Sequence, residues 1–277
     1  MSAYIADQSW NLEPERLGAL ELSLDSATRE FLSRRGLQPG WRCLEVGAGS
    51  GSIARWLADQ VGVWGHVLAI DLDTTLLQGI EHDSLQVMQC DVMRDELPEA
   101  SFDLVHARLV VGHLSDRDRA IQRLIATLRP GGWLVIEDAD FLWTELGSQP
   151  VYPETAAASF YRVWNATVQL MKHRGYDGHW GRHIPAALRR HGLHHVGGES
   201  RALIGDRNLT AALQMTIERF QPELIEANQI THAEAVAVKN LLLSDEVTLT
   251  ASPTVSAWGQ RQLLPIANKG IAPSAPM

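Results

Sequence analysis

The chain of 277 residues can bury a substantial core, either as one large domain or as a domain with an appended cap. Hydrophobic residues make up 45% of it and charged residues 21%, which is ordinary for a soluble globular protein. The formal net charge of −9 argues against a sequence-independent nucleic-acid binder, because such a protein needs a basic surface to displace counterions from phosphates.

The N-terminal section, residues 1–35, is expected to form a helical cap. Between residues 12 and 35, apolar side chains recur at steps of three and four, which predicts helix: Leu17, Leu20, Leu24, Ala27 and Phe31. The segment "GLQPG" at 36–40 ends this section, because glycine and proline interrupt helices.

Short apolar strands and helices alternate between residues 41 and 138. Strands are predicted at 41–46, 66–71, 85–91, 102–107 and 133–138. Helices are predicted at 52–61, at 73–81 and from Ser115, where Asp118 completes a variant of the capping box, as far as "RPGG" at 129–132. This alternation is typical of a parallel sheet with helices on both faces.

The pattern changes after residue 140. Residues 141–182 are rich in aromatic side chains and partly helical, and Pro185 is expected to begin a helix over 185–191, since proline suits the first turn. The other predicted elements are a strand near 193–204, helices at 208–228 and 232–244, the second opening on the capping box "THAE", a strand around 254–258 and a flexible tail at 266–277. The main domain would span 36–265, with substrate-side inserts at about 141–182 and 207–245.

Three glycines, Gly47, Gly49 and Gly51, fall where the first strand turns into the first helix of this domain. Such a turn brings bare backbone N–H groups close to a ligand. The dinucleotide fingerprint requires a glycine where Ser52 stands, and Glu45 would gain nothing beside a pyrophosphate. A cationic amino-acid ligand would gain from that carboxylate, so the loop favours S-adenosylmethionine over a nicotinamide dinucleotide.

Two further acids follow the next strands. Asp71 ends the second strand, 20 residues after Gly51, where a carboxylate can accept hydrogen bonds from two ribose hydroxyls. Both ligands carry that ribose, so Asp71 does not distinguish them. Asp91 follows the third strand, where an acid can meet an adenine amino group.

The ordered motifs "LEVGAGSG", "AIDLD", "CDV", "FDLVHARLVVGHL" and "LRPGGWLVIED" resemble those of class I S-adenosylmethionine-dependent methyltransferases. The resemblance covers roughly residues 38–140, and the set in this order is highly specific. It implies an α/β fold: a Rossmann-like three-layer sandwich whose seven-stranded, mostly parallel sheet has an antiparallel last strand, which 254–258 could supply. A helical N-terminal lid and helical inserts would complete it.

The resemblance also implies where the cofactor, S-adenosyl-L-methionine, would bind. Glu45 and Gly47 would lie by its amino-acid end, Asp71 by its ribose, and Asp91 with Val92 by its adenine. Ala107 and Arg108 would line the wall beside the sulfonium. The full set of expected cofactor-binding residues is Glu45, Gly47, Ala48, Gly49, Ser50, Gly51, Asp71, Leu72, Asp91, Val92, Ala107 and Arg108.

Candidate catalytic residues are His113 and Tyr4. His113 follows the fourth strand and could act as a general base, since imidazole titrates near working pH; the alternative is a histidine that packs near the following helix. Tyr4 and Trp10 belong to the N-terminal segment, which in similar enzymes folds over the site as a lid. Either could touch substrate, or only fasten that segment to the body.

The aromatic residues of 143–180 are the best clue to the substrate. On an inserted segment they would suit a flat, apolar or aromatic small molecule, or they would form the core of the insert itself. With Trp10, the candidate substrate-binding residues are Trp143, Tyr161, Trp164 and Trp180.

No metal site is expected. The histidines at 179, 183, 191, 194 and 195 have no cysteine or close acid partner in the sequence pattern, and solvated histidines explain them better. Cys43 and Cys90 lie in apolar strands without metal-type spacing, which indicates buried thiols in a reducing compartment. The start "MSAYIADQSW" is unlike a signal peptide and no apolar run has membrane-spanning length, so we expect a cytoplasmic protein.

We therefore predict an enzyme, an S-adenosylmethionine-dependent methyltransferase acting on N, O or an electron-rich C of a small, aromatic or indole-like metabolite. The general layout resembles bacterial tailoring methyltransferases of natural-product pathways. The alternatives are an NAD-dependent oxidoreductase of Rossmann type and a non-catalytic S-adenosylmethionine-binding protein. The expected partner is a small-molecule substrate, with no nucleic acid and no membrane, and a homodimer stays open.

Overall fold

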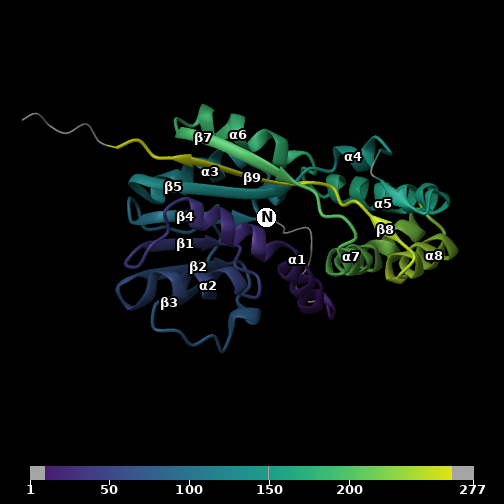
Figure 1. The fold of residues 1–277 in the computed structure, drawn as a ribbon, viewed down its shortest axis with the longest axis horizontal. Coiled ribbons are helices and arrows are strands. Elements are labelled where there is room, and N and C mark those ends of the chain that lie inside the picture. The colour runs from purple at the N-terminus through teal and green to yellow at the C-terminus, as the bar shows by residue number, and fades with distance from the viewer. Residues whose placement is uncertain (1–9, 149, 264–277) are drawn as a thin grey trace, which may run out of the picture.

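The computed structural model describes residues 10–148 and 150–263, and its central feature is a seven-stranded sheet in the order β3-β2-β1-β4-β5-β9-β7 (Figure 1). The strands β1 to β5 pair in parallel, whereas β9 is antiparallel to both of its neighbours, β5 and β7. The strands are β1 (Arg42–Val46), β2 (His66–Asp71), β3 (Leu85–Gln89), β4 (Phe102–Arg108), β5 (Leu128–Ala139), β7 (His194–Arg201) and β9 (Thr254–Gln260). The predicted fold class, including the antiparallel last strand, is confirmed.

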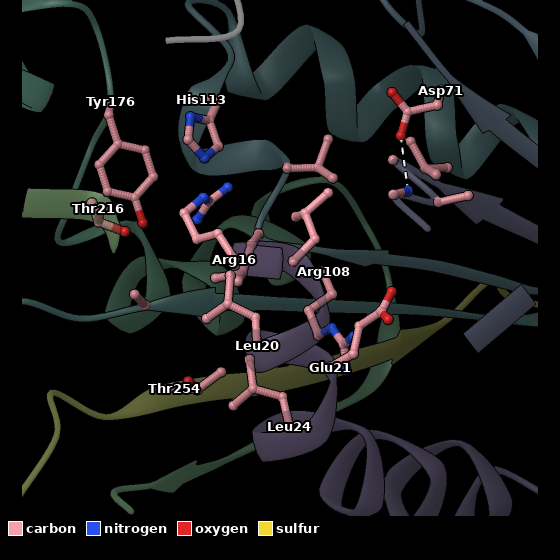
Figure 2. A pocket seen from close by; sticks show the side chains of 18 of the residues that line it. Arg16, Leu20, Glu21, Leu24, Asp71, Arg108, His113, Tyr176, Thr216 and Thr254 are labelled. Carbon is pink, nitrogen blue, oxygen red and sulfur yellow. Dashed lines mark hydrogen bonds between the residues drawn. The ribbon is translucent and has the colours of Figure 1, made fainter. Parts of the chain in front are cut away.

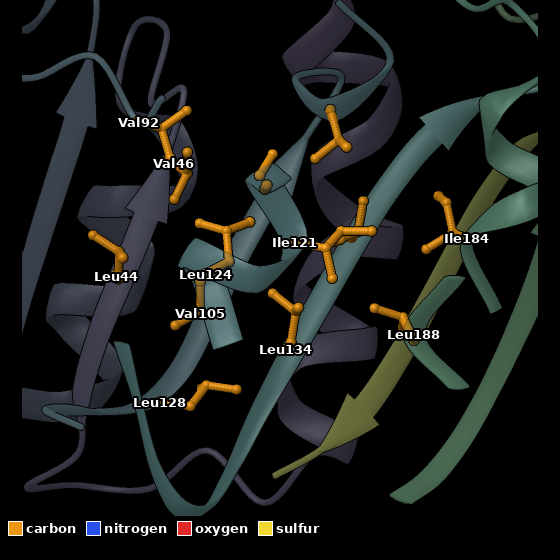
Figure 3. Packing of buried hydrophobic residues seen from close by; sticks show 14 of the residues in the cluster. Leu44, Val46, Val92, Val105, Ile121, Leu124, Leu128, Leu134, Ile184 and Leu188 are labelled. Carbon is orange, nitrogen blue, oxygen red and sulfur yellow. The ribbon is translucent and has the colours of Figure 1, made fainter. Parts of the chain in front are cut away.

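Helices cover both faces of this sheet. On one face α1 (Glu13–Arg34) and α2 (Ser52–Val61) bury Leu32 and Leu57 against strand residues such as Leu104. On the other face α3 (Arg117–Thr127) and α6 (Trp180–Arg190) pack on the strands, and Figure 3 shows their apolar side chains meeting those of β1, β4 and β5. The result is the three-layer arrangement expected for a sheet whose strands are apolar on both sides.

A helical lobe lies beyond the carboxyl ends of the parallel strands (Figure 1). It consists of α4 (Leu142–Glu145), α5 (Glu154–His173), α7 (Arg207–Glu226) and α8 (His232–Leu243), with a small sheet of β6 (Val151–Tyr152) and β8 (Thr248–Leu249). The lobe has its own core, centred on Phe160, Trp164 and Phe220. The capping box predicted at Thr231 is present, with Glu234 as its second member.

Three local predictions need correction. The predicted helix at 73–81 is only a 3₁₀ turn, η2 (Thr75–Leu77); the other such turns are η1 (Gly62–Trp64) and η3 (Val111–His113). The helix expected to begin at Ser115 is capped instead by Asp116, which accepts from the Arg119 N–H. The helix expected to begin at Pro185 begins at Trp180 and carries the proline inside it.

The early start of α6 has a packing reason. The Cα of Gly181 lies so close to β5 that an added Cβ would be 2.7 Å from the Asp138 carbonyl oxygen. Trp180, Ile184 and Leu188 are buried on the same side of the helix. Burial of these side chains stabilises the first turn and outweighs the hydrogen bond that Pro185 cannot donate.

The described part of the chain contains no helix that is both long and apolar enough to cross a bilayer. Cys43 and Cys90 are buried and not in a disulfide. The tail predicted at 266–277 lies outside the described residues, and the division into cap, domain and inserts stays a prediction.

Candidate functional site

One pocket lies between the carboxyl ends of β1 to β4 and the helices α1, α5 and α7 (Figure 2). The cavity has a volume of about 250 Å³. Its walls come from the glycine turn and the loops after the strands on one side, and from helices of the N-terminal section and the helical lobe on the other. In parallel α/β sheets this edge is where ligands bind.

The glycine turn after β1 needs glycine for conformational and steric reasons. Gly47, Gly49 and Gly51 all have positive φ, at 68°, 57° and 86°. An added Cβ at Gly47 would lie 2.2 Å from Cγ2 of Val110. A Cβ at Gly49 would meet only Leu17 Cδ1 of α1, at 4.0 Å, so this glycine faces open space across the pocket. The turn is thus built to admit a ligand against its backbone.

The acids predicted at the strand ends converge on the same pocket. Asp71, at the end of β2, accepts a hydrogen bond from the Gly49 N–H at 2.9 Å and so fixes the glycine turn (Figure 2). Asp91, just after β3, accepts from the Met93 N–H at 2.8 Å. Both side chains line the pocket together with Glu45. Three carboxylates therefore face one end of it, which favours a cationic ligand there.

Glu45 belongs to a chain of buried polar groups that crosses the sheet. His106 on β4 is fully buried, with Nδ1 at 2.7 Å from Glu45 Oε2 and Nε2 at 3.0 Å from Glu137 Oε1 on β5. The other oxygen of Glu137 accepts from the Ser256 hydroxyl on β9. Because both ring nitrogens face carboxylates, both must donate, and only the imidazolium form can do so.

The electrostatics agree with that geometry. Burial lowers the pKa of His106, but the charge of Glu45 and the hydrogen bonds to both carboxylates outweigh it and raise that pKa to about 9. Burial raises the pKa of Glu137, yet the hydrogen bond from His106 and its charge hold that pKa below its usual value. Glu45 is thereby oriented at the pocket edge by a partner that carries positive charge.

Helix α1 is fastened over this acid end of the pocket by polar contacts. The Arg108 guanidinium donates to Asp25 at 2.9 Å and to the Thr28 hydroxyl at 3.0 Å. Ser50 of the glycine turn donates to Glu21 of α1 at 2.5 Å, and Ser52 donates to Asp25 at 3.1 Å. Arg108 thus serves mainly to hold α1, although it also lines the pocket as expected.

At the other end of the pocket, His113 lies with its ring 4.5 Å from that of Tyr176 (Figure 2). Burial, followed by the charges of Arg16 and Arg117, lowers the pKa of His113 to about 3. Its imidazole is therefore neutral at working pH and a weak proton acceptor. The Tyr176 hydroxyl donates to Asp138 at 3.2 Å, and burial raises the pKa of that carboxyl to about 6.

The helical lobe makes this second end mainly apolar. Phe141 and Trp164 meet edge to face, with ring centroids 5.8 Å apart. Two arginines stand among the apolar side chains: Arg16 from α1 and Arg219 from α7. The apolar residues that the helical lobe and the loop before it add to the pocket lining are Phe141, Trp164, Met171, Leu209, Leu213 and Phe220.

Most of the predicted site residues meet in this one pocket. Those that line it are Glu45, Gly47, Ala48, Gly49, Asp71, Leu72, Asp91, Val92, Arg108, His113 and Trp164. The other described candidates are outside its lining: Ser50, Gly51, Ala107, Trp10, Trp143, Tyr161 and Trp180. Tyr4 lies outside the described residues.

The outlying candidates have structural surroundings of their own. Ala107 and Trp180 are buried in the main core, and Tyr161 packs against the core of the helical lobe. Trp143 is 39% exposed on α4. The ring of Trp10 lies 5.4 Å from the Arg219 guanidinium and so supports a pocket residue.

Sequence reasoning missed several residues that the fold brings to the site. Arg16, Arg219 and Tyr176 come from three segments far apart in the chain, and no local motif marks them. A sequence pattern could have predicted the network around His106. Glu45, His106 and Glu137 are ionisable residues inside three otherwise apolar strand segments. Among the described residues there is no cluster of three or more His, Cys, Asp or Glu side chains suited to a metal ion.

Comparisons with known proteins agree with this geometry. Residues 44–136 match the family described as "Methyltransferase domain". The chain is 30% identical over 128 residues to the ubiquinone/menaquinone biosynthesis C-methyltransferase UbiE of Laribacter hongkongensis, a match that covers 44% of this chain and 51% of that protein. The chain spans about half or less of the length of the curated relatives it matches first.

Two solved structures share the fold at low identity. The crystal structure of the [4+2]-cyclase SpnF aligns with a TM-score of 0.55 at 17% identity, covering 87% of this chain and 82% of that one. A phosphoethanolamine N-methyltransferase 2 of Haemonchus contortus, in complex with S-adenosylhomocysteine, aligns with a TM-score of 0.51 at 17% identity, covering 94% of this chain and 54% of that one.

The residues present fit the cofactor of this family, S-adenosylmethionine, because three glycines leave backbone of the turn uncovered and three carboxylates line the same end of the pocket. The carboxylates do not suit a pyrophosphate, because they would repel its negative charge. The glycine turn, Glu45, Asp71 and Asp91 all lie within the matched segment. Residues 44–136 match the methyltransferase-domain family, and together with the sheet order and the relatives they support a class I S-adenosylmethionine-dependent methyltransferase.

Proposed function

We propose that this protein transfers a methyl group from S-adenosylmethionine to N, O or an electron-rich C of a small molecule with an apolar, aromatic body. The observation that carries the proposal is the division of one pocket into an acid end at the glycine turn and an apolar end in the helical lobe. A cationic donor suits the first end and an apolar acceptor the second.

When bound, S-adenosylmethionine supplies a methyl group already activated by its sulfonium. The chain then has to hold, orient and enclose the reactants. Glu45 and Asp71 attract and place the donor's amino and ribose groups, and α1 covers the pocket and excludes water. His113 and Tyr176 border the apolar end, where a neutral imidazole can accept a hydrogen bond from the acceptor and orient it.

An enclosed pocket favours a small molecule over a protein or nucleic-acid substrate. Helix α1 and the lobe helices α5 and α7 line the pocket, so an acceptor has to fit between them. The relatives' names include both C- and N-methyltransferases, so they do not select the accepting atom. A role in natural-product metabolism, a cytoplasmic location, the exclusion of nucleic acid and a homodimer stay predictions.

Calorimetric titration with S-adenosylhomocysteine and with NAD tests the proposal. We expect binding of the nucleoside and none of NAD; tighter binding of NAD would end the proposal. Incubation with S-adenosylmethionine and a panel of aromatic and indolic metabolites should then give S-adenosylhomocysteine and a product heavier by one methyl group. Binding without any turnover across the panel would favour a non-catalytic binding protein.

A matched pair of glycine variants sharpens the test. Gly49→Val places a side chain in the open space of the pocket, whereas Gly79→Val places one at an exposed turn with no atom within 4 Å. Both glycines have positive φ, so both variants carry similar backbone strain. We expect Gly49→Val alone to abolish binding of S-adenosylhomocysteine, and equal loss in both variants would refute the placement of the donor at the turn.

A further inference from the structure

Two arginines of the apolar end share one buried carboxylate. Arg16 on α1 pairs with Glu13 through two bonds, Nε to Oε2 at 2.8 Å and Nη2 to Oε1 at 2.6 Å. Arg219 on α7 reaches the same Glu13 with Nη1 to Oε2 at 3.1 Å. The Arg16 side chain is 11% exposed, that of Arg219 is 8% exposed and that of Glu13 is fully buried. We call this group the arginine pair with Glu13.

The arrangement fixes both guanidinium groups at the pocket wall. Glu13 holds them from α1, and the ring of Trp10 lies 5.4 Å from the Arg219 guanidinium. Figure 2 shows the Arg16 side chain extending toward His113, across the space bordered by Tyr176 and Leu20. A guanidinium held in this way keeps its N–H donors in a fixed planar arrangement. Two parallel N–H groups then match the two oxygens of a carboxylate or phosphate.

The net charge of this group is opposite in sign to the charge at the acid end of the pocket, where the methyl donor is proposed to bind. Two guanidinium groups and one carboxylate sum to one positive charge, and the pocket end that holds Glu45, Asp71 and Asp91 is acidic. The charge of Arg16 also acts on a neighbouring group, because after burial it is the next cause that lowers the pKa of His113.

From this geometry we propose that the arginine pair with Glu13 is the acceptor's recognition site, and that the methyl acceptor carries an oxyanion, a carboxylate or a phosphate, on its apolar body. The inference rests on the proposed function, because it names the chemical class of substrate for the same pocket. The donor's positive charge and the acceptor's negative charge are then received at opposite ends of one cavity.

The test uses the whole protein saturated with S-adenosylhomocysteine. It is titrated with matched pairs of aromatic acids and their neutral primary amides: phenylacetate and phenylacetamide, indole-3-acetate and indole-3-acetamide, and 1-naphthoate and 1-naphthamide. Phenyl phosphate, set against phenol, separates phosphate from carboxylate recognition. A charge-assisted bidentate contact should make the acids or the phosphate bind more than about tenfold more tightly than their neutral partners.

Variants tie that preference to the two arginines. Arg219→Gln and Arg16→Gln should each reduce it, and Arg219→Lys, which keeps the charge but not the fork, should restore part of it. The control is Arg162→Gln on α5, which removes a 61% exposed guanidinium that pairs with Glu234. Thermal unfolding and binding of S-adenosylhomocysteine show that each variant is folded, and Arg219→Lys serves where Arg219→Gln does not fold.

The outcomes separate the two proposals. A preference for anions that is lost in both glutamine variants and kept in Arg162→Gln supports the recognition site. Anions that bind no better than amides, a preference unchanged in the variants, or no binding by any anion of the panel would overturn it. Failure of S-adenosylhomocysteine itself to bind would instead refute the proposed function. Normal binding of the nucleoside without a preference for anions would refute only the arginine recognition site.

Discussion

The buried histidine between β1 and β5 gives a pH dependence that can be measured. His106→Gln removes the positive charge from between Glu45 and Glu137 and leaves two carboxylates in the interior. The native pKa of His106 is about 9, against 6.5 for a free histidine. At about 1.4 kcal/mol for each tenfold change in proton affinity, this difference corresponds to about 3 kcal/mol of unfolding free energy.

The sign of the effect follows from the raised pKa. The folded protein holds this proton more tightly than the unfolded chain, so the stabilisation is fully present below about pH 6.5. It falls as the pH rises from there and is lost above about pH 9. The lowered pKa of Glu137 adds stability that is present above pH 4.5 and declines below it, so the network stabilises the fold most between these limits.

Urea unfolding at pH 6.0, 7.5 and 9.5 measures this dependence. We expect His106→Gln to lose about 3 kcal/mol relative to the native chain at pH 6.0, and clearly less at pH 9.5. The control is His173→Gln, which removes an exposed imidazole on α5 and should change stability little at any pH. A loss that is the same at all three pH values, or an NMR titration of His106 with a midpoint near 6.5, would refute the imidazolium assignment.

Three further predictions concern the pocket. Asp71→Ala should weaken binding of S-adenosylhomocysteine by more than about 1 kcal/mol in calorimetry, since it removes a charge-assisted contact and the tie to the Gly49 N–H, whereas Asp73→Ala should not. For His113, whose pKa is about 3, the ratio of native to His113→Gln kcat/KM should be constant between pH 6 and 9; a ratio that changes around pH 6.5 would make His113 the titrating base. Arg108→Gln should destabilise the protein by about 2 kcal/mol and speed release of S-adenosylhomocysteine, because it frees α1 from β4. The control is Arg29→Gln, which removes a 43% exposed guanidinium that pairs with the same Asp25 and should have neither effect. Stopped-flow release with equal rates in both variants would show that Arg108 does not hold α1.

Sequence reasoning predicted those elements of the fold that short-range sequence patterns determine. Each parallel strand is a short apolar run beside a turn signal, so β1, β2 and β4 were predicted nearly to the residue. The start of α6 was not, because the proline rule describes an isolated helix, and the contact of Gly181 with β5 is invisible in the chain order. Tertiary packing overrode local preference there.

The same distinction explains the site. The glycine turn and the acids after β2 and β3 belong to the strand ends that define the pocket, and their place follows from the parallel sheet. Arg16 and Arg219 meet at Glu13 although about 200 positions separate them. Their meeting depends on how α1 packs against α7, which amphipathic periodicity does not specify, so the sequence marked α1 as a cap without showing that it supplies a pocket cation.

Helix α1 links the two ends of the pocket mechanically. Its C-terminal half carries Asp25 and Thr28, which Arg108 holds against β4 beside the glycine turn. Its first turn carries Glu13, which positions Arg16 and Arg219 at the apolar end. Because these residues lie on one continuous helix of 22 residues, a displacement of α1 that broke its contacts with Arg108 would also carry Glu13 and Arg16 away from Arg219 on α7. The proposed donor and acceptor ends of the pocket therefore both depend on the same seating of α1.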